Sequence, residues 1–163
     1  MKPQNLIFIG LGALLLGAAI MYKTKGWSVP DKAAPFLKDF QAATEKYHLP
    51  AFLLIRQAQQ ESGFDPHAIN TSSGAQGILQ IVPRWHPNVN PFNAPEAIDY
   101  AAQYMRYLYN KFGTWEEALQ AYNWGEGNLA KFQAGKIQYM PDETKNYYTN
   151  IMKDVRNANR IPT

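Results

Sequence analysis

The chain has 163 residues, 46% of them apolar and 18% charged, which favours one globular domain and argues against disorder. Its net charge of +3 comes from the first 32 residues, because twelve basic and twelve acidic residues follow them, so the pI of about 9.0 gives no reason to predict nucleic-acid binding. The absence of cysteine excludes disulfide scaffolds, thiolate metal sites and cysteine nucleophiles, but it does not exclude export, because such a chain folds in either redox compartment.

The N-terminal part of the chain contains an apolar segment. Residues 6–22 carry no charge and have lysines on both sides. As a helix this stretch rises about 25 Å, the short end of what crosses the hydrocarbon core of a bilayer. We expect a membrane anchor within residues 1–25, with a cleaved signal peptide or a buried core helix as the alternatives. Residues 26–35 contain glycine, serine and two prolines and predict an irregular linker.

Helical spacing of apolar residues dominates the rest of the chain, and we predict one domain over residues 36–163. Residues 63–93, which are rich in glycine, proline, asparagine and serine, predict mostly loops between helices. No alternating run predicts a long strand, so the expected fold class is mainly α with six to eight short helices. The predicted helices lie before Tyr47, after Pro50, over residues 98–112, from Trp115 to near Gly125, and after Pro141.

Two local signals refine the middle of this pattern. Gly113 is predicted to end the helix over residues 98–112, and the aromatic residues of that helix are assigned to the core. Thr114 and Glu117 have the spacing of a capping box, so we predict that the next helix begins directly after Thr114.

Glu61 is the residue most informative about chemistry. It lies at the end of the helix that follows Pro50, within QAQQESGFDP, just before a glycine-containing turn. A carboxyl group partly removed from water at the rim of a cleft has a raised pKa, and it then suits general-acid catalysis near neutral pH. Taken alone, this segment also fits a glutamate that simply faces solvent at a helix end.

Four short motifs follow one another along the chain. They are Glu61–Ser62, residues 74–81 (GAQGILQI), residues 121–125 (AYNWG) and residues 143–147 (ETKNY). In this order they resemble the soluble lytic transglycosylase (SLT) domain family of the goose-type lysozyme superfamily, over roughly residues 36–157. The departures are small: Ile78-Leu79 stands where the family usually has Leu-Met, and the loop between the first two motifs is slightly longer than in many relatives.

The resemblance implies a lysozyme-like fold of short helices around a substrate cleft. It implies cleavage of the β-1,4 bond between N-acetylmuramic acid and N-acetylglucosamine in peptidoglycan, with formation of a 1,6-anhydro end. Glu61 would protonate the glycosidic oxygen and then, as a carboxylate, take the proton of the C6 hydroxyl that attacks C1. The expected partners are the glycan strands, a membrane through residues 6–22, and a secretion, conjugation or virion assembly. No cofactor is expected.

The same motifs supply the candidate substrate-binding residues. The amides of Gln80 and Asn123 offer donors and acceptors for sugar groups, and a tyrosine hydroxyl could hold the Glu61 carboxyl or an N-acetyl carbonyl. Glycines allow a close approach of the backbone, and the longer loop leaves open which of two hydroxyl residues, Thr71 or Ser72, fills the family's position. The full set of candidates is Ser62, Thr71, Ser72, Gly77, Gln80, Tyr122, Asn123 and Tyr147.

Other residues receive structural or open assignments. Asp65 precedes a proline in a turn, Glu126 is interpreted as a solvated loop charge, and Glu143 as a residue that braces the site rather than reacting. The three histidines have no partner at ligand spacing, so no metal site is predicted. The aromatic residues that either stack on sugar rings or belong to the core are Phe64, Trp85 and Trp124.

Two other functions remain open at this point. A hydrolytic muramidase would use water in place of the C6 hydroxyl, and such hydrolases usually place a second carboxylate across the bond. A non-catalytic peptidoglycan-binding or virion protein of the same fold would have no need of Glu61. In each case we expect the domain to face the cell wall in the periplasm or envelope, anchored or exported according to the fate of residues 1–25, or to be a membrane or entry component of a virion.

Overall fold

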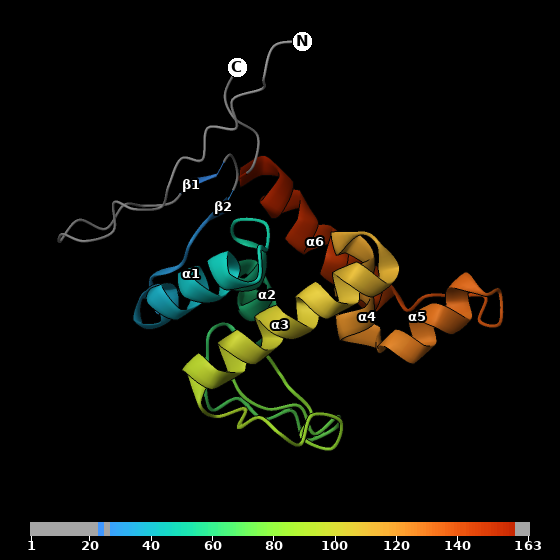
Figure 1. Cartoon of the computed structure of the whole chain (residues 1–163), viewed down its shortest axis with the longest axis horizontal. Helices are drawn as coiled ribbons and strands as arrows, with labels where there is room; N and C mark the ends of the chain where they lie inside the picture. Colours follow the sequence, from blue (N-terminus) through green and yellow to red (C-terminus); the bar gives the residue numbers. More distant parts are fainter. Residues whose placement is uncertain (1–22, 25–26, 159–163) are drawn as a thin grey trace, which may run out of the picture.

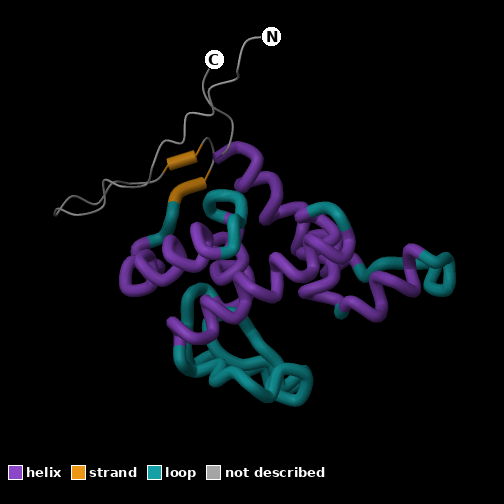
Figure 2. Tube along the Cα trace, viewed as in Figure 1, coloured by secondary structure: helices purple, strands orange, loops and turns teal. Residues whose placement is uncertain are grey.

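Helices dominate the computed structural model, which describes residues 23–24 and 27–158 (Figures 1 and 2). This confirms the mainly α fold class. The elements are β1 (Lys23–Thr24), β2 (Trp27–Ser28), the 3-10 helix η1 (Asp31–Phe36), α1 (Leu37–Lys46), α2 (Leu53–Ser62), α3 (Ala94–Phe112), α4 (Trp115–Trp124), α5 (Glu126–Gln133) and α6 (Asp142–Ala158).

The predicted apolar segment over residues 6–22 lies outside the described residues. Among the helices that the structure does describe, none combines the length and the apolar character needed to cross a bilayer.

Helix α3 forms the centre of the molecule (Figure 1). It packs against α1 on one side and α4 on the other, while α6 packs against α4 and α2. The apolar stripe predicted from the sequence lies on the inner side of α3, where it meets these neighbours. The stripe residues that are fully buried are Ile98, Ala101, Ala102, Met105 and Leu108.

Local signals set the boundaries of α3 and α4 as predicted. Gly113 ends α3 in a left-handed conformation with φ of 98°, which a residue with a side chain adopts only under strain. The Thr114 hydroxyl accepts a hydrogen bond from the Glu117 backbone N–H (3.1 Å) and donates to its carboxylate (2.8 Å). Thr114 is therefore the N-cap of α4, as predicted. Only this half of the capping box is present, because the Glu117 carboxylate accepts from the Thr114 hydroxyl and not from its backbone N–H.

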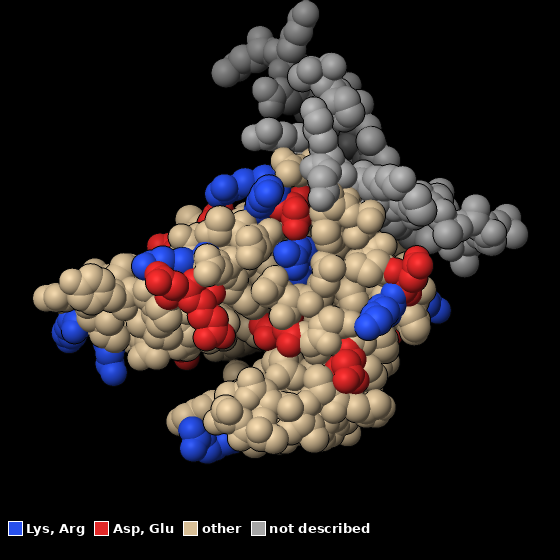
Figure 3. All heavy atoms as spheres, turned by 180° about the vertical axis from the view of Figure 1, so that it is seen from behind, with Lys and Arg blue, Asp and Glu red and all other residues tan. Residues whose placement is uncertain are grey.

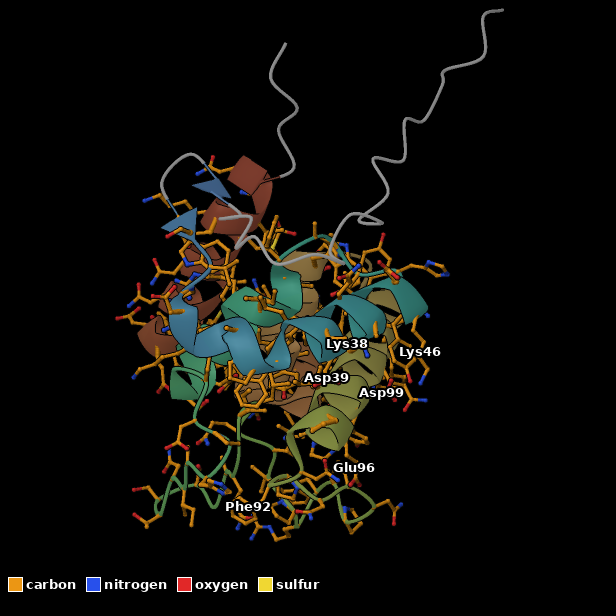
Figure 4. All side chains as sticks on the ribbon, turned by 90° about the vertical axis from the view of Figure 1, so that its left-hand side faces the viewer. Lys38, Asp39, Lys46, Phe92, Glu96 and Asp99 are labelled. Atoms are coloured by element: carbon orange, nitrogen blue, oxygen red, sulfur yellow. The ribbon has the colours of Figure 1, made fainter. Side chains whose placement is uncertain are left out.

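Two ion pairs join helices that are distant in sequence. Lys46 of α1 reaches Asp99 of α3 at 2.8 Å on the surface, as Figure 4 shows. Arg56 of α2 meets Asp154 of α6 at 2.7 Å, and these two side chains are only 13% and 14% exposed. A shielded pair of this kind is costly to break, because it leaves one charge without its partner. The ion pair therefore stabilises the packing of α2 against α6.

Residues 63–93 form a lobe of loops below the start of α3, coloured green in Figure 1. Isolated bridges pair Gln76 with both Ile69 and Ile81, and they fold the lobe back on itself. At its junction with α3, the Glu96 carboxylate accepts a hydrogen bond from the Asn90 backbone N–H (3.0 Å); Figure 4 shows Glu96 there. The predicted loop region thus folds as a compact unit attached to α3.

Residues 27–36 pack onto the helical domain, which differs from the irregular linker predicted over residues 26–35. The Trp27 indole N–H donates to the Gln59 side-chain oxygen on α2 at 2.7 Å, and Ala33 in η1 is fully buried. Glycine, serine and proline in this segment favour turns in the local sequence. The packing of residues 27–36 depends instead on contacts with α2, which the local sequence does not reveal.

Gly77 and Gly74 form a matched pair for testing the lobe. Both have positive φ, 72° and 77°, but a Cβ at Gly77 would lie 1.8 Å from the Pro91 carbonyl oxygen, whereas a Cβ at Gly74 would meet nothing within 4 Å. We predict that Gly77→Ala lowers the free energy of unfolding by about 3 kcal/mol or more, from strain plus a backbone clash. Gly74→Ala should lose only about 1 kcal/mol, from strain alone. Urea denaturation measures both, and equal losses would contradict the close approach.

Candidate active site

Glu61 lies in the last turn of α2. This helix directs Leu53, Leu54 and Ala58 into the core, and it ends at Gly63, which has φ of 62°. The left-handed glycine turns the chain sharply out of the helix into the loop lobe. Glu61 is consequently partly buried, at the boundary between the helical body and the lobe.

Tyr147 of α6 holds the Glu61 carboxyl group. Its hydroxyl donates to Glu61 Oε1 over 2.5 Å, and its side chain is buried. Burial, followed by the charge of Glu61, raises the pKa of Tyr147 well above its ordinary value, so the hydroxyl keeps its proton and remains a donor. Of the two tyrosines proposed from the sequence to hold Glu61, the geometry selects Tyr147.

Burial raises the pKa of Glu61 from 4.5 to about 7. The hydrogen bond from Tyr147 opposes this shift because it stabilises the carboxylate, and the negative charge of Glu143 adds to it. A carboxyl group with this pKa is substantially protonated at neutral pH and can also ionise there. Glu61 can therefore both give and take a proton in one reaction.

A cavity of about 880 Å³ lies between the loop lobe and the helical body, and Glu61 and Tyr147 are not among the residues that line it. The face shown in Figure 3 is hollowed between the lobe and the body. Three of the predicted binding residues, Gln80, Tyr122 and Asn123, line the cavity. The charge of Glu61 helps to raise the pKa of Tyr122, after the larger effect of burial, which places Tyr122 near the carboxyl group.

Hydrogen bonds orient the two amide side chains in the cavity. Gln80 donates through Nε2 to the Gly77 carbonyl (3.0 Å), so its Oε1 acceptor is directed elsewhere. Asn123 accepts through Oδ1 from the Thr144 hydroxyl (2.7 Å), so its amino group is left to donate. The cavity thus presents one amide acceptor and one amide donor, the pair that an N-acetyl group or sugar hydroxyls require.

Tyr122 and Ser62 bind backbone rather than facing a ligand with their hydroxyl groups. The Tyr122 hydroxyl donates to the Leu79 carbonyl (2.8 Å), and the Ser62 hydroxyl donates to the Ile78 carbonyl (2.9 Å). Both bonds tie the loop lobe to the helices that carry the first and third motifs. Ser62 therefore has a structural role at the end of α2, because it positions the second motif next to Glu61.

Three further candidates lie away from Glu61. Thr71 and Ser72 are exposed on a turn around Asn70, whose side chain accepts from the Ser72 backbone N–H (3.0 Å). Within the described residues, no hydrogen bond joins either hydroxyl to Glu61. Gly77 is buried, and its close approach is to the Pro91 carbonyl rather than to open space for a substrate. Glycine at this position is therefore explained by the close approach of the Pro91 backbone, and not by the approach of a substrate that the motif suggested.

Of the other acids, Asp65 accepts from the His67 backbone N–H (2.8 Å) in a turn, as predicted. Glu143, which we expected to brace the site, is exposed on the first turn of α6 and acts on Glu61 only through its charge. Glu126 differs, because it lines the cavity and forms an ion pair with Lys111 at 2.8 Å. Among the described residues, no group of three or more His, Asp and Glu side chains is arranged to hold a metal ion.

The aromatic residues divide between the core and the cavity. Phe64 is buried and packs edge-on against Phe40 with ring centroids 6.3 Å apart, so it is a core residue. Trp85, which is 66% exposed, and Trp124 both line the cavity.

Sequence reasoning missed two features near the site. Gln57 is fully buried one turn before Glu61, and its polar side chain lies close enough to Tyr147 to act on the pKa of that residue. The second feature corrects the assignment of all aromatic residues of the 98–112 helix to the core. Three of them line the cavity instead, and their spacing of four and three residues on one helix face was a signal for this. They are Tyr100, Tyr104 and Tyr107.

Comparisons with known proteins agree with this geometry. A family model described as the transglycosylase SLT domain matches residues 38–147. Protein IpgF of Shigella flexneri is 27% identical over 131 residues, which make up 73% of this chain and 85% of that protein. The probable transglycosylase SceD of Staphylococcus aureus (strain Newman) is 38% identical over 69 residues, covering 37% of this chain and 30% of that protein.

A solved structure shows the same fold. The 70 kDa soluble lytic transglycosylase SLT70 from Escherichia coli aligns with a TM-score of 0.61 and 23% identity. The alignment covers 74% of this chain but only 23% of SLT70, so the chain spans less than a quarter of that protein's length. The predicted lysozyme-like fold is thereby confirmed for the helical domain.

We predict that Tyr147→Phe raises the pKa of Glu61 above its value of about 7, because the lost hydrogen bond favoured the carboxylate. The variant should also lose about 1 kcal/mol of unfolding free energy. Carbon-13 NMR titration of the Glu61 carboxyl measures the shift. Tyr122→Phe is the matched control, because its hydroxyl binds the Leu79 carbonyl. An equal shift in both variants, or a fall in the Tyr147 variant, would contradict the assignment.

Proposed function

Because the chain belongs to the transglycosylase SLT domain family, we propose that it is a peptidoglycan lytic transglycosylase. It cleaves the β-1,4 bond between N-acetylmuramic acid and N-acetylglucosamine and leaves a 1,6-anhydromuramic acid end. The observation that carries the proposal is Glu61, a partly buried carboxyl group with a pKa of about 7 that Tyr147 holds. Gln80, Tyr122 and Asn123 of the neighbouring motifs line a cavity of about 880 Å³. The name of the probable transglycosylase SceD supports the same type of reaction.

In the first step, protonated Glu61 gives its proton to the glycosidic oxygen while the bond from C1 to that oxygen breaks. The N-acetyl group of the muramic acid residue stabilises the positive charge that develops at C1. In this proposal the Asn123 amino group holds the N-acetyl carbonyl in position, and the support for it is that the bond from Thr144 occupies the Asn123 oxygen and not its amino group. Burial supports this step, because it keeps the proton on Glu61 near neutral pH.

In the second step, the Glu61 carboxylate accepts the proton of the C6 hydroxyl as that oxygen attacks C1. The new bond between C1 and O6 closes the anhydro ring, and Glu61 is protonated again, so no water is consumed. Tyr147 assists here, because its hydrogen bond stabilises the carboxylate that exists between the two steps. One carboxyl group with a pKa near neutrality is sufficient for the cycle.

We further propose that this cleavage opens the wall locally, for a secretion or conjugation apparatus, for wall turnover, or for a phage particle that crosses the envelope. The domain then faces the wall, in the periplasm or envelope. A membrane anchor in residues 6–22 would hold the enzyme at this place, and the support for it is the apolar composition of that segment.

Mass spectrometry of muropeptides released from purified sacculi tests the reaction. We predict products that are lighter than hydrolysed muropeptides by one water, since the anhydro ring forms within the sugar. Products with a free reducing end would instead make the protein a hydrolytic muramidase. Release of no product by the folded protein would favour a non-catalytic binding protein.

Glu61→Gln is the accompanying control. Glutamine keeps the shape of the side chain but cannot give the proton, so we expect product release to fall by roughly a thousandfold or more while sacculus binding persists. Full activity in this variant would remove Glu61 from the mechanism.

The anchor is tested by expressing the full chain and a variant that lacks residues 1–25 in a bacterial host. We predict that the full chain sediments with membranes and resists extraction at high salt, while the shortened variant does not. If both variants fractionate alike, residues 6–22 are not an anchor.

A further inference from the structure

A glutamine occupies a fully buried position of α2, one turn before Glu61. Gln57 has no exposed surface, and other buried residues of the same helix, among them Leu53 and Ala58, belong to the apolar core. Side chains four residues apart lie on the same face of a helix. Gln57 therefore lies beside Glu61 on α2, close to Tyr147 of α6, which contacts both.

A buried amide at this position is costly for the fold. An apolar side chain of the same size would pack without cost, because an amide gives up its hydrogen bonds to water when it is buried. Within the described part of the chain, the other buried residue with a polar, non-aromatic side chain is Thr144, whose hydroxyl binds Asn123. Both buried polar groups thus lie next to candidate site residues, and such departures from an apolar core are typical of functional sites.

Gln57 acts on the hydroxyl group that holds Glu61. Its amide lowers the pKa of Tyr147, as a donor to the phenol oxygen does, while burial keeps that pKa well above its ordinary value. Neither polar atom of Gln57 has a closed hydrogen bond within the described residues, so this contact is looser than the one between Tyr147 and Glu61. The Tyr147 oxygen donates its proton to Glu61 and keeps its lone pairs, so it can accept from Gln57 at the same time.

We propose that Gln57 is a positioning residue for Glu61, whose amide donates to the Tyr147 oxygen and keeps the Tyr147 hydroxyl directed at the carboxyl group. A hydroxyl that accepts a hydrogen bond becomes a stronger donor, because successive hydrogen bonds polarise one another. The series Gln57–Tyr147–Glu61 therefore stabilises the carboxylate. Gln57 does not line the cavity of about 880 Å³, so it acts through Tyr147 and not on a substrate. The effect of Gln57 on the reaction rests on the proposed function.

The test replaces Gln57 by methionine, which has nearly the same shape but no hydrogen-bond donor. We expect Gln57→Met to raise the midpoint of the carbon-13 NMR titration of Glu61 by about 0.3 pH units or more, because the Tyr147 donor becomes weaker. The alkaline limb of the pH profile for product release from sacculi should move in the same direction, since Glu61 must hold its proton in the first step. Sacculus binding should stay unchanged.

Two further comparisons separate positioning from packing. In the Tyr147→Phe background, Gln57→Met should raise the midpoint no further, because the hydroxyl that connects the two residues is absent. Gln60→Met is the matched control: Gln60 is exposed on the same helix and directly precedes Glu61, so this variant should titrate like the parent. Gln57→Leu also lacks the donor, and it makes the result independent of how methionine packs.

Several results would overturn the inference. These are an unchanged Glu61 midpoint in Gln57→Met and Gln57→Leu, an equal rise in Gln60→Met, the same rise with and without the Tyr147 hydroxyl, or failure of both Gln57 variants to fold, which would make the glutamine a packing residue. The midpoint is measured without substrate. A protein that shows the expected shift but never cleaves sacculi would therefore overturn the proposed function and keep the role of Gln57 in positioning the Glu61 carboxyl group.

Discussion

The hydrogen bond between Tyr147 and Glu61 is the interaction on which the site depends. It joins α6 to α2 across 86 residues of sequence, so it exists only if both helices are placed correctly. The largely shielded ion pair between Arg56 and Asp154 crosses the same helix interface and restricts how the two helices can slide. The geometry of the candidate site is therefore a property of helix packing, and the loop lobe adds further polar groups.

The same hydrogen bond balances the two protonation states of Glu61 that the proposed reaction requires. Burial favours the protonated acid, whereas the Tyr147 hydroxyl favours the carboxylate, and the outcome is a pKa of about 7. Stronger burial would leave Glu61 unable to ionise, and a more exposed position would leave it unable to hold its proton. An enzyme that works with one carboxyl group in both steps needs this intermediate position.

Much of the helical framework could be predicted from the sequence, because apolar spacing and the N-cap at Thr114 are local signals. The family and the place of Glu61 followed from four motifs whose order is specific, and the family match confirms the family assignment. Tertiary contacts decided what the sequence did not predict. Gly77 meets Pro91, Phe64 meets Phe40, and the tyrosines of α3 face a cavity, although each residue type fitted another role equally well locally.

The position of Glu61 has a consequence for folding itself. Its pKa is about 7 in the folded protein against 4.5 for the free side chain, so the folded state holds the proton more tightly than the unfolded chain. The contribution of Glu61 to the free energy of unfolding is fully present below about pH 4.5 and is lost as the pH rises through about 7. Because the group is partly exposed, this contribution is about 2 kcal/mol. Loss of the Glu61 proton therefore lowers the free energy of unfolding of the domain, and mildly acidic surroundings raise it.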